Sequence, residues 1–376
     1  MKRLAQVVLN AEGTIGGEQR HVLHVIDGLD PERFAVEVIT WDIPAFVAEL
    51  DRRGVPVVAV TARRILDWGL LRRIESQLRA GGLDLVHAHG HRAGLLGRLA
   101  AIRAGVPHIV WTCHLAGNKA DRNPVIKWGY RQVLRYLDAR TDVTIAVSEN
   151  LRDWLVSEGI AAEKIVVNTN GVDSSVFHAG ERNRALLEEL GLDPDAPVVG
   201  TVARLTEQKG VDSFIAAAEG VARMVPSAQF LIVGAGPLEA QLHAQAAETR
   251  VRIVFAGERG DIPVVLRSLD IAVVPSLWEG AFCFSVLEAM ASRTPVICSD
   301  IPIFTDVVSS GTEAVIFPAG DSEALGTAIV SLLEHPDAAD VMAEAGMRLV
   351  QSRFSVAELQ KRTAEIYERL LRGERS

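Results

Sequence analysis

The sequence predicts an α/β protein in which two doubly wound parallel sheets form two domains. Short β-rich apolar runs alternate with helical patterns along the chain, which is typical of successive βαβ units. The runs are almost wholly apolar, and this indicates strands that helices cover on both faces. A polar stretch over residues 179–197 separates two series of runs. A chain of 376 residues is long enough for two such domains.

The apolar runs give the expected strands in order. In the first series they are 4–10, 35–40, 55–60, 83–89, 107–113, 143–148 and 164–170. In the second they are 198–204, 229–236, 252–257, 271–276, 294–300 and 314–318. The last segment has apolar residues at helical spacing, which predicts an amphipathic helix that must pack on another part of the chain. We therefore expect domains at 1–180 and 181–355 and a C-terminal helix within 356–376.

Composition excludes several classes of protein. Hydrophobic residues make up 48% and charged residues 23% of the chain, as in an ordinary globular protein. No apolar run approaches the roughly 20 residues that a membrane-spanning helix needs. The formal net charge of -9 argues against a nucleic-acid partner. Three widely spaced cysteines predict neither a disulfide framework nor a zinc ligand set, which favours a cytoplasmic location.

Charge is unevenly distributed along the chain. Residues 61–140 hold 14 basic and five acidic side chains, although the whole chain is acidic. The span 124–140 within them mixes basic residues with Trp128 and aliphatic side chains, so it predicts a basic amphipathic helix. Such a region could receive an anionic acceptor or an anionic membrane surface. The alternative is that cationic side chains solvate helix faces while the apolar side packs inward.

Two glycine-rich loops follow expected strands. Gly16 and Gly17 lie between the first strand and the first helix, where backbone amides and the helix dipole can approach a phosphate. A tight turn without a ligand is the alternative. The loop from Gly234 to Gly236 resembles the start of a dinucleotide fingerprint, but Glu239 stands where the last glycine belongs. This departure argues against a nicotinamide dinucleotide.

Charged side chains follow strands of the second series. Arg204 comes at the end of one strand and Lys209 at the start of the next helix, a pair that suits a diphosphate without a metal. Glu279 and Glu288 could hold sugar hydroxyls, while Glu288 could equally stabilise a helix N-terminus. In a doubly wound fold, ligands bind at the carboxyl ends of the strands. We therefore expect these residues to line a cleft between the two domains.

Histidines are concentrated in the first half of the chain. His114 follows a strand directly and can hydrogen-bond to a sugar or phosphate oxygen. His87, His89 and His91 alternate at a strand end, which allows either a metal site or neutral histidines in the core. No carboxylate accompanies them at ligand spacing, so the core interpretation is favoured.

Taken together, the motifs resemble those of a known enzyme family. The matching segments are Gly16–Gly17, 83–89, 111–114, 145–148, 170–173, 203–210, 230–237, 270–280, 286–302 and 317–325. In this order and at these spacings they resemble glycosyltransferase family 4, the retaining nucleotide-sugar transferases of the GT-B fold. The resemblance implies transfer of a sugar from a nucleoside diphosphate sugar to an acceptor hydroxyl, without a metal or other cofactor. It also implies a last helix that crosses back to the N-terminal domain.

The resemblance assigns roles to particular residues. Those expected to act in catalysis are His114, Glu279, Arg204 and Lys209. Those expected to bind the donor are Gly16, Gly17, Arg204, Lys209, Arg259, Glu279, Phe284, Ser285 and Glu288. The diphosphate would lie on the two cations and on the amides of Phe284 and Ser285, and the nucleobase near 257–260. The implied acceptor is a glycan or a lipid-linked, anionic cell-envelope molecule, reached from the inner face of the membrane.

One departure from the family pattern concerns the two glutamates. Glu279 and Glu288 have eight residues between them where the family usually has seven, and the intervening loop lacks the usual glycine after Phe282. Donor placement or activity could therefore differ. A nucleotide-sugar epimerase on the same architecture and a noncatalytic sugar-nucleotide sensor are the two rival hypotheses.

Overall fold

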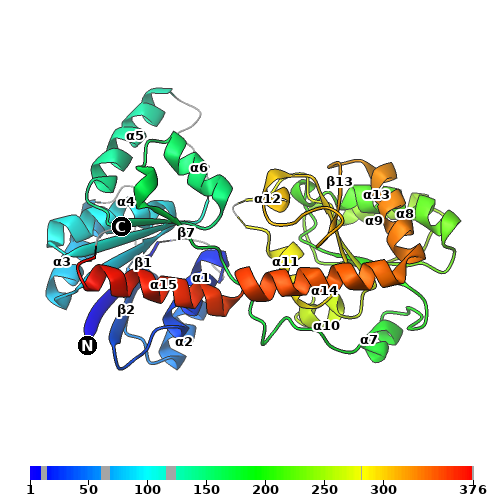
Figure 1. Ribbon diagram of the computed structural model, residues 1–376, viewed down its shortest axis with the longest axis horizontal. Coiled ribbons are helices and arrows are strands. Elements are labelled where there is room, and N and C mark those ends of the chain that lie inside the picture. Colours follow the sequence, from blue (N-terminus) through cyan, green and yellow to red (C-terminus); the bar gives the residue numbers. More distant parts are fainter. Residues whose placement is uncertain (10–14, 61–67, 116–123, 281, 375–376) are drawn as a thin grey trace. The chain divides into compact units, whose positions relative to one another are not determined.

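The computed structural model describes residues 1–9, 15–60, 68–115, 124–280 and 282–374, with the backbone alone at 124–127. The chain divides into two compact units (Figure 1). Unit 1 comprises Met1–Gly171 and Val356–Ser376, and unit 2 comprises Val172–Ser355. The first division thus lies nine residues before the position that the sequence pattern suggested, because Val172 already bonds to unit 2 through the carbonyl of Phe354.

Unit 1 is built on a parallel seven-stranded sheet in the order β3-β2-β1-β4-β5-β6-β7. Its strands are β1 (Lys2–Val8), β2 (Phe34–Trp41), β3 (Val57–Val60), β4 (Leu85–His89), β5 (His108–Cys113), β6 (Val143–Ala146) and β7 (Ile165–Val167). Its helices are α1 (Gly17–Asp27), α2 (Pro44–Arg52), α3 (Trp68–Gly81), α4 (Gly90–Ala104), α5 (Pro124–Asp138), α6 (Glu149–Ser157), the short 3-10 helix η2 (Ala162–Lys164) and α15 (Val356–Leu371).

The last helix belongs to unit 1, as the family resemblance implied. Leu359, Ile366, Tyr367 and Leu370 are buried, and the last three join the apolar cluster formed by α1, β1 and β4–β6. Each such side chain contributes about 1.5–3 kcal/mol on burial. Helix α15 lies beside α1 (Figure 1), and a side chain at Gly28 would collide with Gln360. The C-terminal segment is therefore part of the first domain's core.

Unit 2 is built on a parallel six-stranded sheet in the order β10-β9-β8-β11-β12-β13. Its strands are β8 (Val198–Val202), β9 (Gln229–Val233), β10 (Ile253–Phe255), β11 (Ile271–Val274), β12 (Val296–Ser299) and β13 (Val315–Phe317). Its helices are α7 (Arg184–Glu189), η3 (Glu207–Lys209), α8 (Val211–Met224), α9 (Glu239–Glu248), α10 (Ile262–Leu266), α11 (Phe284–Ala291), α12 (Pro302–Thr305), α13 (Ser322–Glu334) and α14 (Pro336–Arg353).

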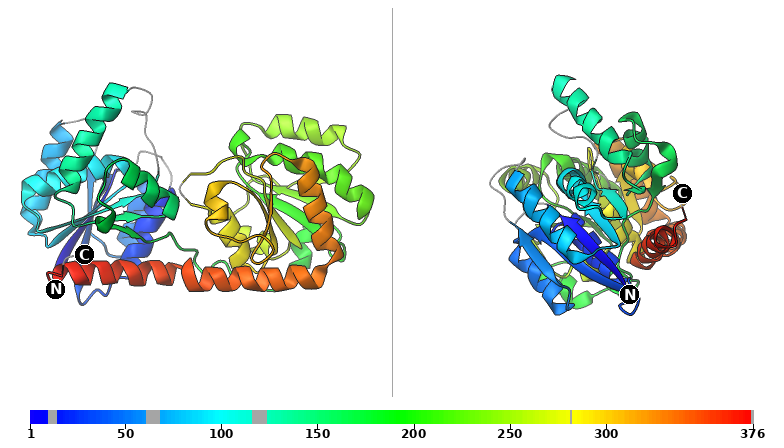
Figure 2. Two further views of the ribbon diagram at one scale, coloured as in Figure 1. Left: turned by 45° about the horizontal axis from the view of Figure 1, so that its top comes forward. Right: turned by 90° about the vertical axis from the view of Figure 1, so that its left-hand side faces the viewer.

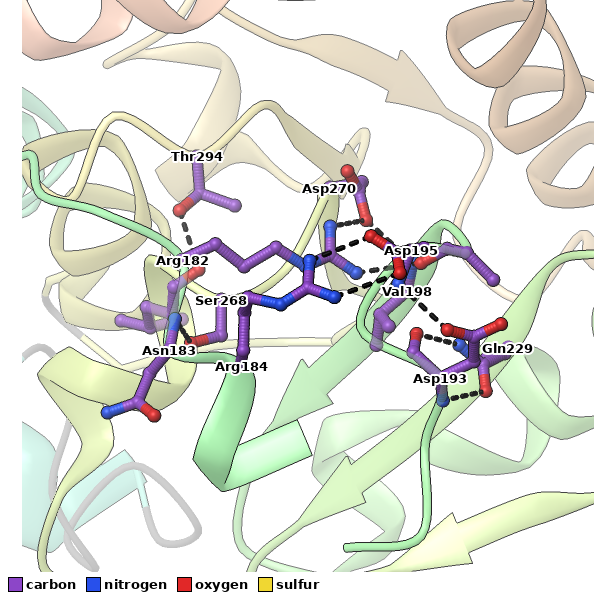
Figure 3. Close-up of polar contacts among 12 residues, drawn as sticks. Arg182, Asn183, Arg184, Asp193, Asp195, Val198, Gln229, Ser268, Asp270 and Thr294 are labelled. Carbon is purple, nitrogen blue, oxygen red and sulfur yellow. Dashed lines mark hydrogen bonds and ion pairs between the residues drawn. The ribbon is translucent and has the colours of Figure 1, made fainter. Parts of the chain in front are cut away.

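A polar network fastens the start of unit 2 to its sheet (Figure 3). Arg182 donates to Asp270 at 2.6 Å and to the carbonyl of Ala196 at 2.7 Å. The same Asp270 carboxylate accepts the amide of Val198 at 2.7 Å, which orients the first residue of β8. Arg184 forms a bidentate ion pair with Asp195 at the surface. The polar stretch between the two apolar series is thus part of unit 2 and is held by hydrogen bonds to its sheet.

Each expected strand corresponds to one observed strand, and all pairings in both sheets are parallel. Helices lie on both sides of each sheet (Figure 2), which agrees with the almost wholly apolar strand sequences. The predicted two-domain α/β architecture is confirmed. Among the described helices, none has both the length and the apolar character needed to cross a bilayer. Cys113, Cys283 and Cys298 are buried and free.

Candidate functional site

The strand orders define one topological switch point in each unit. In unit 1, β2 and β3 are added on one side of β1 and β4–β7 on the other, so the switch point lies between β1 and β4. In unit 2 it lies between β8 and β11. Ligands of doubly wound folds bind outside the carboxyl ends of the strands at such points, because the neighbouring loops leave the sheet in opposite directions. In unit 1, the loop after β1 leads through Gly16 to Gly17 at the start of α1, and β4 ends at His89. The loops after β8 and β11 carry Arg204, Lys209 and Glu279.

Arg204 and Lys209 follow β8 but lie in different surroundings. Arg204 is exposed, and within the described part of the chain it has no ion pair. Lys209 ends the short helix η3, and its ammonium pairs with a carboxylate oxygen of Glu279 in the loop after β11. The Lys209 and Glu279 side chains are only 19% and 9% exposed, so this is a largely buried ion pair.

Three neighbours hold the Glu279 carboxylate. Besides the Lys209 ammonium, Ser276 donates its hydroxyl to Oε1 at 2.7 Å and Gln208 donates its amide to Oε2 at 3.1 Å. A carboxylate with this many donors is fixed in place and keeps its charge near the cation. Lys209 and Glu279 therefore form one preorganised polar group, in which the lysine charge is partly balanced.

Glycines allow the loops at this edge of the sheet to interlock. Gly234 has φ +134°, and a side chain there would collide with the carbonyl of Ala203. Side chains at Gly236 and Gly210 would likewise collide with the carbonyls of Leu205 and Pro275. The Gly234–Gly236 segment therefore packs against the loop that carries Arg204, and the glycines serve this close approach rather than a dinucleotide fingerprint.

The N-terminus of α11 supplies backbone donors. Phe284 and Ser285 are its first two residues, whose amides have no carbonyl partner within the helix, and Cys283 before them gives no side-chain cap. The helix dipole adds partial positive charge at this end, which suits a phosphate. Glu288 is the fifth residue of α11 and is half-buried. Ala281, in the loop that carries the extra residue, lies outside the described residues.

Arg259 is engaged by carboxylates in this structure. Its guanidinium makes two bonds of 2.8 and 2.9 Å to Asp261 and one of 3.0 Å to Glu189 of α7. These partners raise the pKa of Arg259 above its ordinary value, and Arg259 in turn lowers the pKa of Asp261. A donor bound near 257–260 would meet this fixed guanidinium rather than a mobile one.

In unit 1, Gly16 and Gly17 lie at the N-terminus of α1. Gly16 is the N-cap residue, and its amide donates to Gln19 Oε1 at 3.1 Å. Gly17 is exposed and begins the helix. Residues 10–14 of the same loop lie outside the described residues. The described part of the loop has the short side chains and helix N-terminus that a phosphate or sugar requires for close approach.

The histidines of unit 1 group differently from the alternating trio in the sequence. His91 pairs with Tyr130 at 3.3 Å, and both ring nitrogens of His87 are bonded, to Tyr367 at 2.5 Å and Thr112 at 2.6 Å. The three histidines that converge are instead His21, His89 and His114. His21, on α1, was missed because a histidine on an expected helix carries no signal of its own in one sequence.

Burial controls the protonation of this cluster. It lowers the pKa of His21 to about 4 and holds the pKa values of His87, His89 and His114 well below the ordinary value. Charge repulsion among the imidazoles acts in the same direction, because one protonated ring opposes protonation of its neighbour. The four rings are therefore neutral at pH 7.

The basic region 61–140 is partly neutralised, and residues 61–67 and 116–123 within it lie outside the described residues. Arg79 and Arg103 share Glu75 at 2.9 and 2.7 Å, and Arg131 pairs with Glu158 at 2.9 Å. Exposed aromatic and aliphatic side chains of α5 lie beside exposed arginines. They are Trp128, Val133 and Tyr136, with Arg135 on the same helix and Arg140 just after its end.

Two family models match successive parts of the chain. Residues 15–176 match Glycosyltransferase Family 4, and residues 183–348 match Glycosyl transferases group 1. An alpha-maltose-1-phosphate synthase of Mycolicibacterium smegmatis is 30% identical over 77% of this chain and 80% of its own length. A phosphatidyl-myo-inositol mannosyltransferase of Mycobacterium leprae is 28% identical over 94% and 93%.

Solved structures show the same fold. A glycosyltransferase from Rickettsia africae has a TM-score of 0.85 at 20% identity and covers 98% of both chains. Anabaena Alr3699/HepE in complex with UDP has a TM-score of 0.84 at 22% identity and covers 98% of this chain and 100% of its own. Two parallel-sheet domains of this arrangement define a GT-B protein. The chain therefore belongs to glycosyltransferase family 4, and it is a glycosyltransferase with the GT-B fold. Nothing in these relatives supports an epimerase or a noncatalytic sensor.

Proposed function

We propose that the chain moves a sugar from a nucleoside diphosphate sugar to an acceptor hydroxyl with retention of the anomeric configuration, and that it needs no metal. The observation that carries this proposal is the polar group at the switch point of unit 2. There an exposed guanidinium, a lysine–glutamate pair and a helix N-terminus follow neighbouring strands β8 and β11.

The diphosphate is the part of the donor that these residues suit. As the bond from the sugar to the leaving phosphate breaks, negative charge grows on the phosphate oxygens. Arg204, Lys209 and the amides of Phe284 and Ser285 would stabilise that charge without a metal ion, and such preorganised donors are typically the largest electrostatic contribution to a rate. Glu279 would keep the Lys209 ammonium in position and hold a sugar hydroxyl; Glu288 would bind the ribose.

His114 is proposed to contact the transferring sugar. Gln6 Oε1 can only accept, so the His89 nitrogen 2.7 Å from it, Nε2, carries the proton. Neutral His89 then accepts at Nδ1 from His114 Nε2, 3.4 Å away. This leaves the Nδ1 lone pair of His114 to accept a hydrogen bond from a sugar hydroxyl. In the same-face reaction, a leaving phosphate oxygen would accept the acceptor's proton.

The acceptor is proposed to be a glycan or a lipid-linked molecule of the cell envelope, reached by a cytoplasmic enzyme at the membrane. Two relatives support this class by name, the mannosyltransferase above and an Escherichia coli galactosyltransferase acting on a diphosphoundecaprenol, 29% identical over 85% of both chains. The exposed Trp128, Arg135 and Tyr136 of α5, with Arg140 just after the helix, would rest on anionic headgroups. Vesicle sedimentation at low and high salt tests this contact, and equal recovery with neutral and anionic vesicles would contradict it.

The proposed reaction is tested with purified protein, a panel of nucleotide sugars and a lipid-diphosphate acceptor. We expect an acceptor-dependent glycoside with the donor's anomeric configuration by NMR, and the same turnover after treatment with EDTA. Replacing His114 with Ala should depress turnover strongly. An inverted product, a requirement for added metal, or an unaffected His114→Ala variant would each contradict the corresponding part of the proposal. UDP-sugars come first in the panel because Anabaena Alr3699/HepE was solved with UDP.

A further inference from the structure

Three imidazoles in unit 1 converge on one point from three different elements. His21 comes from α1, His89 from the end of β4, and His114 from the residue after β5. One nitrogen of each lies within 4.8 Å of the others. His21 and His89 are 3% and 0% exposed, and His114 is partly exposed. The group is therefore buried on one side and reachable from the other.

Amide oxygens orient the two buried rings. His21 Nδ1 lies 2.7 Å from Asn170 Oδ1, and His89 Nε2 lies 2.7 Å from Gln6 Oε1. An amide oxygen accepts, so each ring carries its proton on the nitrogen that faces the amide. The lone pairs are then on His21 Nε2 and His89 Nδ1. This is the arrangement of metal-binding histidines, whose second nitrogen donates to a neighbouring oxygen.

His21 Nε2 has no hydrogen-bond partner among the described residues, although it is buried. A buried lone pair without a partner costs free energy unless a ligand or water meets it. His89 Nδ1 and His114 Nε2 are 3.4 Å apart. Two nitrogens bound to one tetrahedral zinc ion at about 2.0–2.1 Å are separated by roughly the same distance.

We propose that His21 Nε2, His89 Nδ1 and His114 Nε2 bind a divalent transition-metal ion of the zinc type, with a water or hydroxide in the fourth position. Three nitrogen ligands and an open position suit Zn²⁺ or Co²⁺, whereas Mg²⁺ and Ca²⁺ prefer oxygen, and no carboxylate belongs to this group in the described ranges. On binding, the His114 proton moves from Nε2 to Nδ1, so the ring stays neutral. His21 must approach the other two by a small shift.

A metal ion bound at this site should inhibit the proposed sugar transfer. This consequence rests on the proposed function, in which His114 contacts the transferring sugar. A metal on Nε2 leaves His114 with a proton on Nδ1, the nitrogen that would otherwise accept a hydrogen bond from the sugar. Zn²⁺ and the donor sugar should then compete, which is compatible with turnover that persists in EDTA.

Binding is measured without reference to activity. The full chain is freed of metal by chelation and titrated with CoCl2, and the visible absorption of the bound Co²⁺ reports its coordination. Zn²⁺ affinity follows from displacement of Co²⁺ and from calorimetry. We expect one equivalent bound with a tetrahedral spectrum, and a Tm that rises with Zn²⁺ concentration.

Three variants separate the site from adventitious binding. His21→Gln and His114→Gln should abolish the tetrahedral spectrum and the rise in Tm. Asn170→Ala should weaken Zn²⁺ binding by about 10–100-fold, because it frees the His21 ring. His335→Gln, an exposed histidine of unit 2, is the matched control and should bind like the parent. Circular dichroism establishes that each variant is folded.

The outcomes distinguish the two claims. Metal binding at this site is contradicted if the parent binds no Co²⁺, or if His21→Gln and His114→Gln bind as tightly as the parent. The inhibitory role is contradicted if saturating Zn²⁺ leaves the KM for the nucleotide sugar unchanged. A chain that transfers no sugar but still binds Co²⁺ through these residues would refute the proposed function and retain the metal site.

Discussion

The largely buried pair of Lys209 and Glu279 allows a quantitative test of the unit 2 site. Removing one partner of a buried ion pair costs about 3–5 kcal/mol. Lys209 is 19% exposed, and Ser276 and Gln208 still donate to the carboxylate, so we expect less. Lys209→Met and Glu279→Gln should each lower the free energy of unfolding by about 2 kcal/mol, allowing for this partial exposure.

The double variant separates the pair from its surroundings. If the two charges stabilise each other, Lys209→Met combined with Glu279→Gln costs less than the sum of the single changes, by about 1–3 kcal/mol. Urea unfolding of the parent, both single variants and the double variant gives this coupling free energy. Arg184→Met is the control, because the Arg184–Asp195 pair is 55% and 74% exposed and should contribute little. Additive costs would refute the claim that Glu279 holds Lys209 in position.

Three other predictions concern glycine, tyrosine and histidine positions. Gly234→Ala should lower the free energy of unfolding by about 3 kcal/mol, because φ is +134° and the added methyl group would collide with the backbone of Ala203. Gly260→Ala is the control: the space around Gly260 is open, so this variant should be nearly neutral in the same urea titration. Tyr367→Phe should cost about 2 kcal/mol in thermal or urea unfolding, because it leaves His87 without a partner at Nδ1; an unchanged stability would contradict the hydrogen-bond network. The folded pKa of His21, about 4, lies below its unfolded value of 6.5, so the unfolded state binds more protons and stability falls as pH falls from 6.5 to 4, by about 3 kcal/mol from this group. Urea unfolding across this pH range should therefore show a smaller loss of stability for His21→Gln than for the parent, and an equal loss in both would contradict the neutral, buried state of His21.

The fold could be predicted from the sequence because each buried parallel strand is a short apolar run. Such runs need no knowledge of their neighbours to be recognised, and the glycine loops and charged residues after them mark the carboxyl edge of each sheet. The amphipathic spacing of Leu359, Ile366 and Leu370 likewise predicted the last helix. The packing partner of this helix was predicted from the family resemblance, because periodicity shows that one face is buried but does not identify the element that covers it.

The partners within the site could not be predicted. Lys209 meets Glu279, 70 positions later, because Gly210 lets η3 approach the loop after β11. Arg259 meets Glu189 across a similar separation. Such pairings depend on the close approach of separate loops, which has no local pattern in the chain. The convergence of His21 with the strand-end histidines has the same origin, because the order of the sheet places α1 beside β4.

The central claim is that the loops after β8 and β11 receive the diphosphate of the donor, and Arg204→Met tests it most directly. Arg204 is exposed, so the substitution should leave stability unchanged. Calorimetric titration with a nucleoside diphosphate and with the matching nucleoside isolates the phosphate contribution. We expect the variant to bind the diphosphate about 10–100-fold more weakly, the loss of one charge-assisted hydrogen bond, and the nucleoside equally well. Equal affinity of parent and variant for the diphosphate would contradict the account.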